Sequence, residues 1–119
     1  LGNLFCFVDN NGLQCSGPVG RVSCIEPAAE KYRAFGWNTK EVDGHDVRQL
    51  AEVYEALPAP DSHIPTMVVA HTMKGKGVSY MENNVAWHNG MVTEEQYRQA
   101  IKELDEAFAK EWGDEKDES

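Results

Sequence analysis

The sequence lacks any long hydrophobic run and has little positive charge. No apolar stretch approaches the ~20 residues that a membrane-spanning helix needs, and no basic, apolar leader of a secreted protein is visible. The 119 residues carry 11 Lys and Arg against 20 Asp and Glu, for a formal net charge of -9. Binding to phosphate-rich partners requires a basic surface, so we expect neither nucleic acid nor an anionic membrane as a partner.

Cysteine is scarce as well. Cys6, Cys15 and Cys24 include no Cys-x-x-Cys pair, and an odd number of cysteines does not make a disulfide framework. A metal site built from thiolates alone is therefore not expected. We interpret the three as reduced thiols of a cytoplasmic protein, with Cys6 buried on a strand.

The residues that are present are typical of one modest globular domain, with 41% hydrophobic and 26% charged residues. Hydrophobic periodicity and turn residues predict an alternation of strands and helices. The expected elements are strands at residues 3–9, 37–43 and 66–70, helices at about residues 26–35, from Asp46 to Pro58 and from Thr93 onwards, and loops at residues 10–24 and 72–92.

This order of elements implies an α/β fold with a parallel sheet and right-handed crossovers. Strands that are apolar on both faces need covering helices and more neighbouring strands than three. We therefore expect part of a doubly wound parallel sheet over residues 1–112, followed at residues 113–119 by a disordered acidic tail. Because the chain starts at Leu1, just before the first strand, we also expect the beginning of the domain to lie upstream.

Each predicted helix has a recognisable start and one apolar face. Pro27 suits the first turn of the first helix, and Asp46 can cap the second. Thr93 and Gln96 fit a capping box for the third. The faces expected to be buried are Ala28, Ala29, Tyr32 and Phe35 in the first helix, Leu50, Val53, Tyr54 and Leu57 in the second, and Tyr97, Ile101, Leu104 and Phe108 in the third.

The segment after the first strand is the first candidate for a ligand site. In a parallel sheet, ligands bind beyond the carboxyl ends of the strands. The strand ends in Asp9-Asn10-Asn11-Gly12-Leu13, which offers carboxylate, carboxamide and carbonyl oxygens, the ligands that Mg²⁺ or Ca²⁺ prefers. Asn-Asn-Gly is also an ordinary turn sequence, and on these residues alone both interpretations stay open.

The loop after the third strand is the second candidate. Gly75 and Gly77 would let backbone amides approach an anion that Lys74 or Lys76 could neutralise. The spacing matches neither a Walker A loop nor a dinucleotide-binding fingerprint, so a phosphate cradle and a simple flexible loop both remain open. Further along the same loop, His88 is a candidate proton carrier or hydrogen-bond donor to a phosphate, with an ordinary loop histidine as the alternative.

Taken in order, these segments resemble the thiamine-diphosphate-binding domain of transketolases, and more narrowly the split form in which that domain is a separate amino-terminal subunit. The resemblance covers about residues 1–110. The matching segments are residues 9–14 with 17–20, 30–37, 42–46, 65–83 and 87–88.

The resemblance implies a role for four of the candidate residues. Asn11 would bind Mg²⁺ through its side chain and Leu13 through its carbonyl, and with Lys74 and His88 they would form the cofactor site. His88 would contact the diphosphate and face the substrate, which makes it the implied catalytic residue. The implied reaction is transfer of a two-carbon ketol unit between sugar phosphates, with thiamine diphosphate and Mg²⁺ as cofactors.

The resemblance also implies what this chain lacks. The family's Gly-Asp-Gly motif, with another metal ligand, and the glutamate that activates the cofactor are not among these residues. We therefore expect the chain alone to be inactive and to need a second transketolase subunit or domain, in a homodimer or heterotetramer of the cytoplasmic pentose phosphate pathway. Asn89 also follows His88 where the family more often has Gly.

Two other interpretations remain. The chain could belong to a related thiamine-diphosphate enzyme, such as a deoxyxylulose-phosphate synthase or a 2-oxoacid dehydrogenase component, although Gly36-Trp37 and Trp87-His88 fit transketolase better. It could also be a non-catalytic α/β module that docks to a partner.

Overall fold

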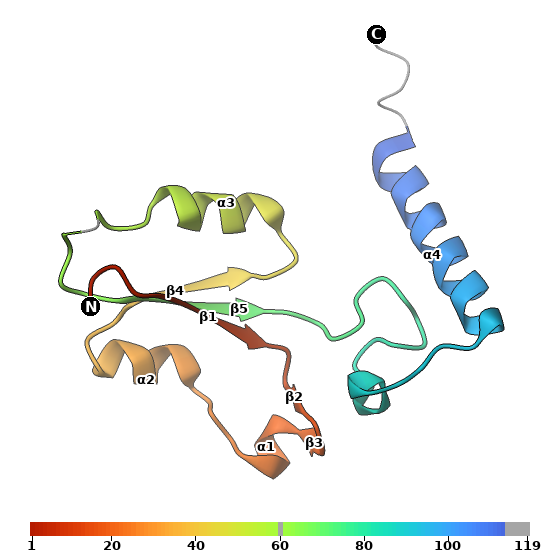
Figure 1. The fold of residues 1–119 in the computed structure, drawn as a ribbon, viewed down its shortest axis with the longest axis horizontal. Coiled ribbons are helices and arrows are strands. Elements are labelled where there is room, and N and C mark those ends of the chain that lie inside the picture. Colours follow the sequence, from red (N-terminus) through yellow and green to blue (C-terminus); the bar gives the residue numbers. More distant parts are fainter. Residues whose placement is uncertain (60, 114–119) are drawn as a thin grey trace, which may run out of the picture. The chain divides into compact units, whose positions relative to one another are not determined.

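The computed structural model describes residues 1–59 and 61–113, and its contacts divide the chain into two units, Leu1–Thr72 and Met73–Ser119. Most of the expected acidic tail, residues 114–119, lies outside the described residues. The first unit contains, in chain order, β1 (Phe5–Asn10), β2 (Leu13–Gln14), β3 (Gly17–Pro18), α1 (Val19–Val22), α2 (Ala28–Ala34), β4 (Asn38–Asp43), α3 (Val47–Glu55) and β5 (Thr66–His71). The second unit contains the 3-10 helix η1 (Val85–His88) and α4 (Glu94–Trp112) (Figure 1).

The first unit is built on a three-stranded parallel sheet in the order β1-β5-β4. The three strands end level, since His71 at the end of β5 pairs with Asn10 of β1 and with Asp43 of β4. Helices α2 and α3 cover opposite faces of this sheet (Figure 1). The predicted α/β class, with parallel strands and crossover helices, is therefore confirmed.

The central position of β5 in the sheet explains why its sequence is apolar throughout. Met67 and Val69 pack towards α2, in a cluster with Ala28 and Ala29. The alternate residues of β5 pack on the other face against α3, in the cluster of Val42, Val68 and Ala70 with Leu50 and Val53. A strand with helices on both faces has no solvent side to reserve for polar residues.

The edge strands and helix ends depart from the predicted burial. β1 and β4 each pair on one side only among the described strands, and Cys6, predicted to be buried, is half-buried on β1. Phe35, predicted for the buried face of the first helix, is 82% exposed, because α2 ends at Ala34 and Phe35 is its C-cap. Tyr54 is likewise 57% exposed on α3, although its ring contacts Phe5.

The helix starts follow the predicted capping signals closely. Asp46 caps α3 by accepting hydrogen bonds from the amides of Arg48 and Gln49. Pro27 is the N-cap of α2 and so lies one position before its predicted place in the first turn. Thr93 and Gln96 form the predicted capping box of α4, each side chain bonding the other's backbone.

The predicted buried face of α4 is exposed in the described part of the chain. Tyr97, Ile101, Leu104 and Phe108 are 53%, 43%, 44% and 64% exposed. Besides this helix of 19 residues, the described part of the second unit holds one loop and η1, whose side chains leave this face open. Although α4 is the longest helix, neither it nor any other described helix has the length and apolarity that crossing a bilayer takes.

Candidate functional site

The predicted metal ligands Asn11 and Leu13 lie in one tight turn at the end of β1. The side-chain oxygen of Asn11 accepts a hydrogen bond from the amide of Leu13 at 2.9 Å. Between them, Gly12 has φ of +72°, a left-handed conformation that glycine adopts without strain. The Asn-Asn-Gly sequence is thus a turn, and the same turn presents amide and carbonyl oxygens beyond the carboxyl end of the sheet.

Residues 10–24, which were predicted to be a loop, contain the short strands β2 and β3 and the helix α1. The short strands β2 and β3 pair as an antiparallel hairpin, in which Gln14 lies opposite Gly17. The carbonyl of Gly12 accepts from the amide of Val19 at 2.9 Å, and the Gln14 side-chain amide donates to the Ser23 carbonyl at 2.9 Å. These contacts brace the turn from its far side, and they depend on pairings that no periodicity in the sequence reveals.

A side-chain hydrogen bond links the ends of β1 and β5. The Thr72 hydroxyl donates to one carboxylate oxygen of Asp9, and the other oxygen of that carboxylate lies 3.5 Å from the side-chain nitrogen of Asn11. The Asn11 amide is thereby oriented with its nitrogen towards Asp9 and its oxygen towards Leu13. Sequence reasoning named Asp9 only as a possible ligand, whereas the structure shows it as a neighbour of Asn11.

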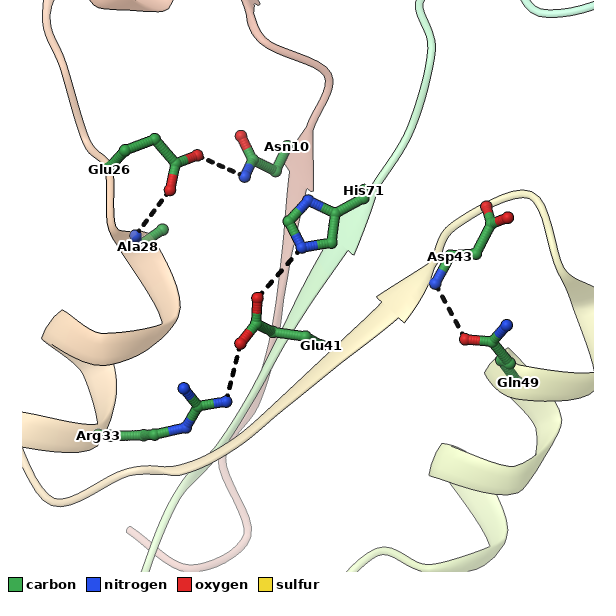
Figure 2. Close-up of polar contacts among 8 residues, drawn as sticks. All are labelled: Asn10, Glu26, Ala28, Arg33, Glu41, Asp43, Gln49 and His71. Atoms are coloured by element: carbon green, nitrogen blue, oxygen red, sulfur yellow. Dashed lines mark hydrogen bonds and ion pairs between the residues drawn. The ribbon is translucent and has the colours of Figure 1, made fainter.

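On the α2 side of the sheet, polar side chains form two groups near the strand ends (Figure 2). The Asn10 side chain donates to Glu26 at 2.7 Å, and the other carboxylate oxygen of Glu26 accepts from the Ala28 amide at 3.0 Å. The bond from the Ala28 amide, then that from Asn10, holds the pKa of Glu26 below its ordinary value.

The second polar group joins three elements. Glu41 of β4 accepts from Arg33 of α2 at 2.9 Å and lies 3.2 Å from a ring nitrogen of His71 on β5 (Figure 2). The hydrogen bond from Arg33, followed by that from His71, keeps the pKa of the Glu41 carboxyl low. Neither polar group was predicted from the sequence, since the bonds between their side chains join residues that are 8, 16 and 30 positions apart.

The candidate phosphate loop in the second unit is a compact turn. A methyl group at Gly75 would lie 2.6 Å from the backbone of Met81, so only glycine fits this close approach. The amide of Gly77 donates to the side chain of Glu82 at 3.0 Å, so a carboxylate of the chain already occupies one of the two amides considered for an anion. Lys74 is half-buried in this turn, and its carbonyl accepts from Asn83 at 2.9 Å.

His88 lies exposed at the end of η1, on a segment that aromatic residues anchor. The Trp87 indole donates to the carbonyl of Tyr80 at 2.9 Å, and the Tyr80 hydroxyl donates to the carbonyl of Gln96 at 2.8 Å. A methyl group at Gly90 would come within 2.5 Å of the Trp87 ring. The glycine after Asn89 therefore has a local reason: it makes room for Trp87 beside His88.

The four predicted site residues fall into two pairs. Asn11 and Leu13 share one turn in the first unit, while Lys74 and His88 belong to the second unit. Within the described residues, no group of three or more His, Cys, Asp or Glu side chains could hold a metal ion. Mg²⁺ needs few protein ligands and prefers oxygens, so the amide and carbonyl oxygens of Asn11 and Leu13 fit part of a magnesium site.

A family model described as the transketolase, thiamine diphosphate binding domain matches residues 1–111 of this chain. The chain belongs to the transketolase family. A subunit of the apulose-4-phosphate transketolase of Phocaeicola vulgatus is 36% identical over 110 residues, which cover 92% of this chain and 39% of that protein. The 6-deoxy-6-sulfo-D-fructose transketolase subunit SqwG of Clostridium sp. is 35% identical over 109 residues, with the same two coverages.

A solved transketolase from Campylobacter jejuni has the same fold. It superposes with a TM-score of 0.61 at 20% identity, and the match covers 99% of this chain but 22% of that structure. This transketolase chain therefore spans well under half the length of the relatives that it matches. The predicted resemblance to the transketolase amino-terminal region is confirmed.

Proposed function

We propose that this chain is the part of a transketolase that supplies magnesium- and diphosphate-binding residues, and that the 119 residues alone are inactive. The observation that carries the proposal is the Asn11–Leu13 turn. It sits beyond the carboxyl end of a parallel sheet, where such folds bind ligands, and it offers oxygens of the type that Mg²⁺ takes. Membership in the family supports the choice of thiamine diphosphate as the cofactor.

Each candidate residue has one task in the proposal. The Asn11 side-chain oxygen and the Leu13 carbonyl hold Mg²⁺, and the hydrogen bond from the Leu13 amide to the Asn11 side chain ties the two residues together. Lys74 offsets negative charge on the diphosphate, and half-burial strengthens this interaction because water screens it less. When bound, thiamine diphosphate supplies the electron sink that ketol transfer requires.

His88 is the proposed catalytic residue. Its exposure at the end of η1 leaves the imidazole accessible to a substrate, and imidazole is the side chain that enzymes use most often for proton transfer. The Trp87 anchor limits how far this backbone can move. His88 would thus donate to an oxygen of the diphosphate or of the substrate from a segment that is anchored within the second unit.

The proposed substrates are sugars that carry an anionic group, with sugar phosphates as the first choice. The names of the two related subunits, which refer to apulose-4-phosphate and to 6-deoxy-6-sulfo-D-fructose, support this class. Both relatives are named as subunits, which supports a second chain or domain as the partner that carries the activating glutamate. We also propose that the assembled enzyme is a homodimer or heterotetramer and that it acts in the cytoplasm, in the pentose phosphate pathway.

One observation favours the alternative of a docking module. The second unit by itself leaves exposed the face of α4 that carries Tyr97, Ile101, Leu104 and Phe108, as expected for a surface that packs against something outside this unit, such as a partner polypeptide. A docking role and a transketolase role are compatible if the partner contributes the rest of the active site.

Titration calorimetry with Mg²⁺ and thiamine diphosphate tests the proposal. We expect weak or no binding to the isolated chain, and binding with ketol transfer when the segment carrying the Gly-Asp-Gly motif and the polypeptide carrying the activating glutamate are both supplied. Ketol transfer by the isolated chain would refute the claim that it is inactive. An assembled complex that binds no thiamine diphosphate would refute the transketolase role and leave the docking module.

A further inference from the structure

We propose that Glu26 is a positioning residue for the magnesium-binding turn and that it acts through Asn10. This inference rests on the proposed function, because it concerns the turn of Asn11 and Leu13 that the proposal assigns to Mg²⁺. Glu26 reaches that turn indirectly, since its carboxylate bonds to Asn10 and Ala28.

The Glu26 carboxylate adds a polar link between the end of β1 and the start of α2, two elements whose residues Cys6, Val8, Ala28 and Ala29 already share one apolar cluster. One oxygen accepts from the Asn10 side chain at 2.7 Å, at the last residue of β1. The other oxygen accepts from the amide of Ala28 at 3.0 Å, at the first residue of α2. Because Asn10 directly precedes Asn11 in the chain, this bridge fixes the point from which the metal-binding turn leaves the sheet (Figure 2).

The same bridge closes the excursion at residues 11–25. This segment leaves the sheet at Asn10 and returns at Glu26, so the bond between those two side chains pins both of its ends. The bonds from Val19 to Gly12 and from Gln14 to Ser23 brace it internally. A segment held in this way has already lost the conformational freedom that it would otherwise lose on binding a cation.

The backbone of Glu26 is held in place as well. The Lys31 ammonium donates to the carbonyls of Ile25 and Glu26, at 2.9 Å and 3.0 Å. Lys31 belongs to α2, so the helix fixes the residue whose carboxylate then reaches Asn10. The low pKa of Glu26 keeps this carboxylate charged at neutral pH, and a charged acceptor makes the stronger hydrogen bond.

The bridge has a strict requirement for donors and acceptors. Both of its partners are N–H donors, so the residue at position 26 must offer two acceptor oxygens. Glu26→Gln keeps the shape but loses one acceptor and sets an amide nitrogen against a donor. Asn10→Asp keeps the shape at the other end but sets two carboxylates against each other.

Combining the two substitutions exchanges donor and acceptor across the bridge. In N10D/E26Q, the amide nitrogen introduced at position 26 can donate to the carboxylate introduced at position 10, while the amide oxygen still accepts from Ala28. The formal charge equals that of the original pair. The double substitution should therefore restore the position of the turn, which a merely destabilised protein would not do.

The experiment measures Mg²⁺ binding to the holoenzyme that contains these residues, by calorimetry at saturating thiamine diphosphate, together with hydrogen exchange over residues 11–25. Partners that orient a metal ligand typically affect metal affinity 10- to 100-fold, so E26Q and N10D should each weaken Mg²⁺ binding about tenfold and speed exchange in this segment. N10D/E26Q should return both measurements towards the original values. Asp46→Asn is the matched control, because it weakens another helix-capping carboxylate of the same unit without touching Asn10.

The outcomes separate this inference from the proposed function. If the unsubstituted holoenzyme binds no Mg²⁺, the proposed function fails and this inference fails with it. If it binds Mg²⁺ and the single substitutions leave the affinity unchanged, only the role of Glu26 is overturned. The role is also overturned if D46N weakens Mg²⁺ binding as much as E26Q, or if N10D/E26Q binds no better than the single variants.

Discussion

The indole nitrogen of Trp87 donates a hydrogen bond to the carbonyl of Tyr80 at 2.9 Å, and the centroids of the two aromatic rings lie 5.2 Å apart. The Tyr80 hydroxyl in turn donates a hydrogen bond to the carbonyl of Gln96, in the first turn of α4. The loop before α4 is therefore not a tether but a folded segment with its own aromatic anchor. Since His88 follows Trp87 directly, changes in this anchor should reach the proposed catalytic histidine.

Gly90→Ala should disturb this anchor. The added methyl group would lie 2.5 Å from the Trp87 ring, and overpacking of this kind costs about 1–3 kcal/mol. We expect the indole N–H resonance of Trp87 to shift and the amide of Trp87 to exchange faster. Gly113→Ala is the control, because a methyl group there meets nothing within 4 Å. An unchanged Trp87 resonance in G90A would contradict the packing described.

Gly75→Ala should be more damaging than Gly36→Ala, although both glycines have positive φ. A left-handed backbone costs an alanine roughly 1–2 kcal/mol at either position. At Gly75 the methyl group would also come within 2.6 Å of the Met81 backbone, whereas at Gly36 it meets nothing within 4 Å. Hydrogen exchange over residues 75–83, compared with exchange around Gly36 in the matched variant, would separate the steric cost from the conformational one.

Glu103→Gln should release the loop from α4. Glu103 accepts from both the amide and the hydroxyl of Ser79, at 2.7 Å each, and its pKa is lowered by hydrogen bonds from Gln99 first and then from Ser79. An amide has one acceptor oxygen and loses one of these bonds, so the Ser79 amide should exchange faster. Glu106→Gln, on the same helix and paired with Lys102, provides the control. Equal effects of the two substitutions would argue against a specific tie.

Acid should destabilise the first unit through Glu26 and Glu41. The folded-state pKa of both carboxyls lies below the ordinary value of 4.5, so the unfolded chain binds their protons more tightly. Their stabilisation is complete above the unfolded pKa and is lost as the pH falls through the lower, folded-state pKa. Glu41→Gln should therefore flatten the fall in stability on the acid side, as measured by urea unfolding across this pH range. Glu52→Gln, which removes an exposed carboxylate from α3, controls for net charge.

The features that the sequence predicted well are those with a local cause. The apolar run of β5 follows from burial on both faces, and Asp46 and the pair Thr93–Gln96 act within one helical turn. The turn at Asn11 and Leu13 has a local cause as well, because it lies within three residues, whereas its role in binding Mg²⁺ stays a prediction.

The features that were missed depend on residues far apart in the chain. Glu26 has an ordinary helix-start sequence around it, and nothing nearby indicates that its partner is Asn10, 16 residues earlier. The pairing of His71 with Glu41 spans 30 residues and follows from the alignment of β4 and β5. The amphipathic pattern of α4 predicted a buried face, which the described part of the second unit leaves exposed, because such a pattern does not say what covers the face.

The two-sided burial of β5 has a consequence for how the strand finds its alignment. Sliding β5 by one residue would exchange the side chains of its two faces, yet both sets are apolar and the core would lose little by the exchange. The polar residues at the strand end are what would suffer, because His71 would turn away from Glu41 and Thr72 from Asp9. The register of the central strand is thus specified by the polar residues at its carboxyl end, beside the residues proposed to bind Mg²⁺. An error in strand pairing would therefore disturb that site more than the apolar core.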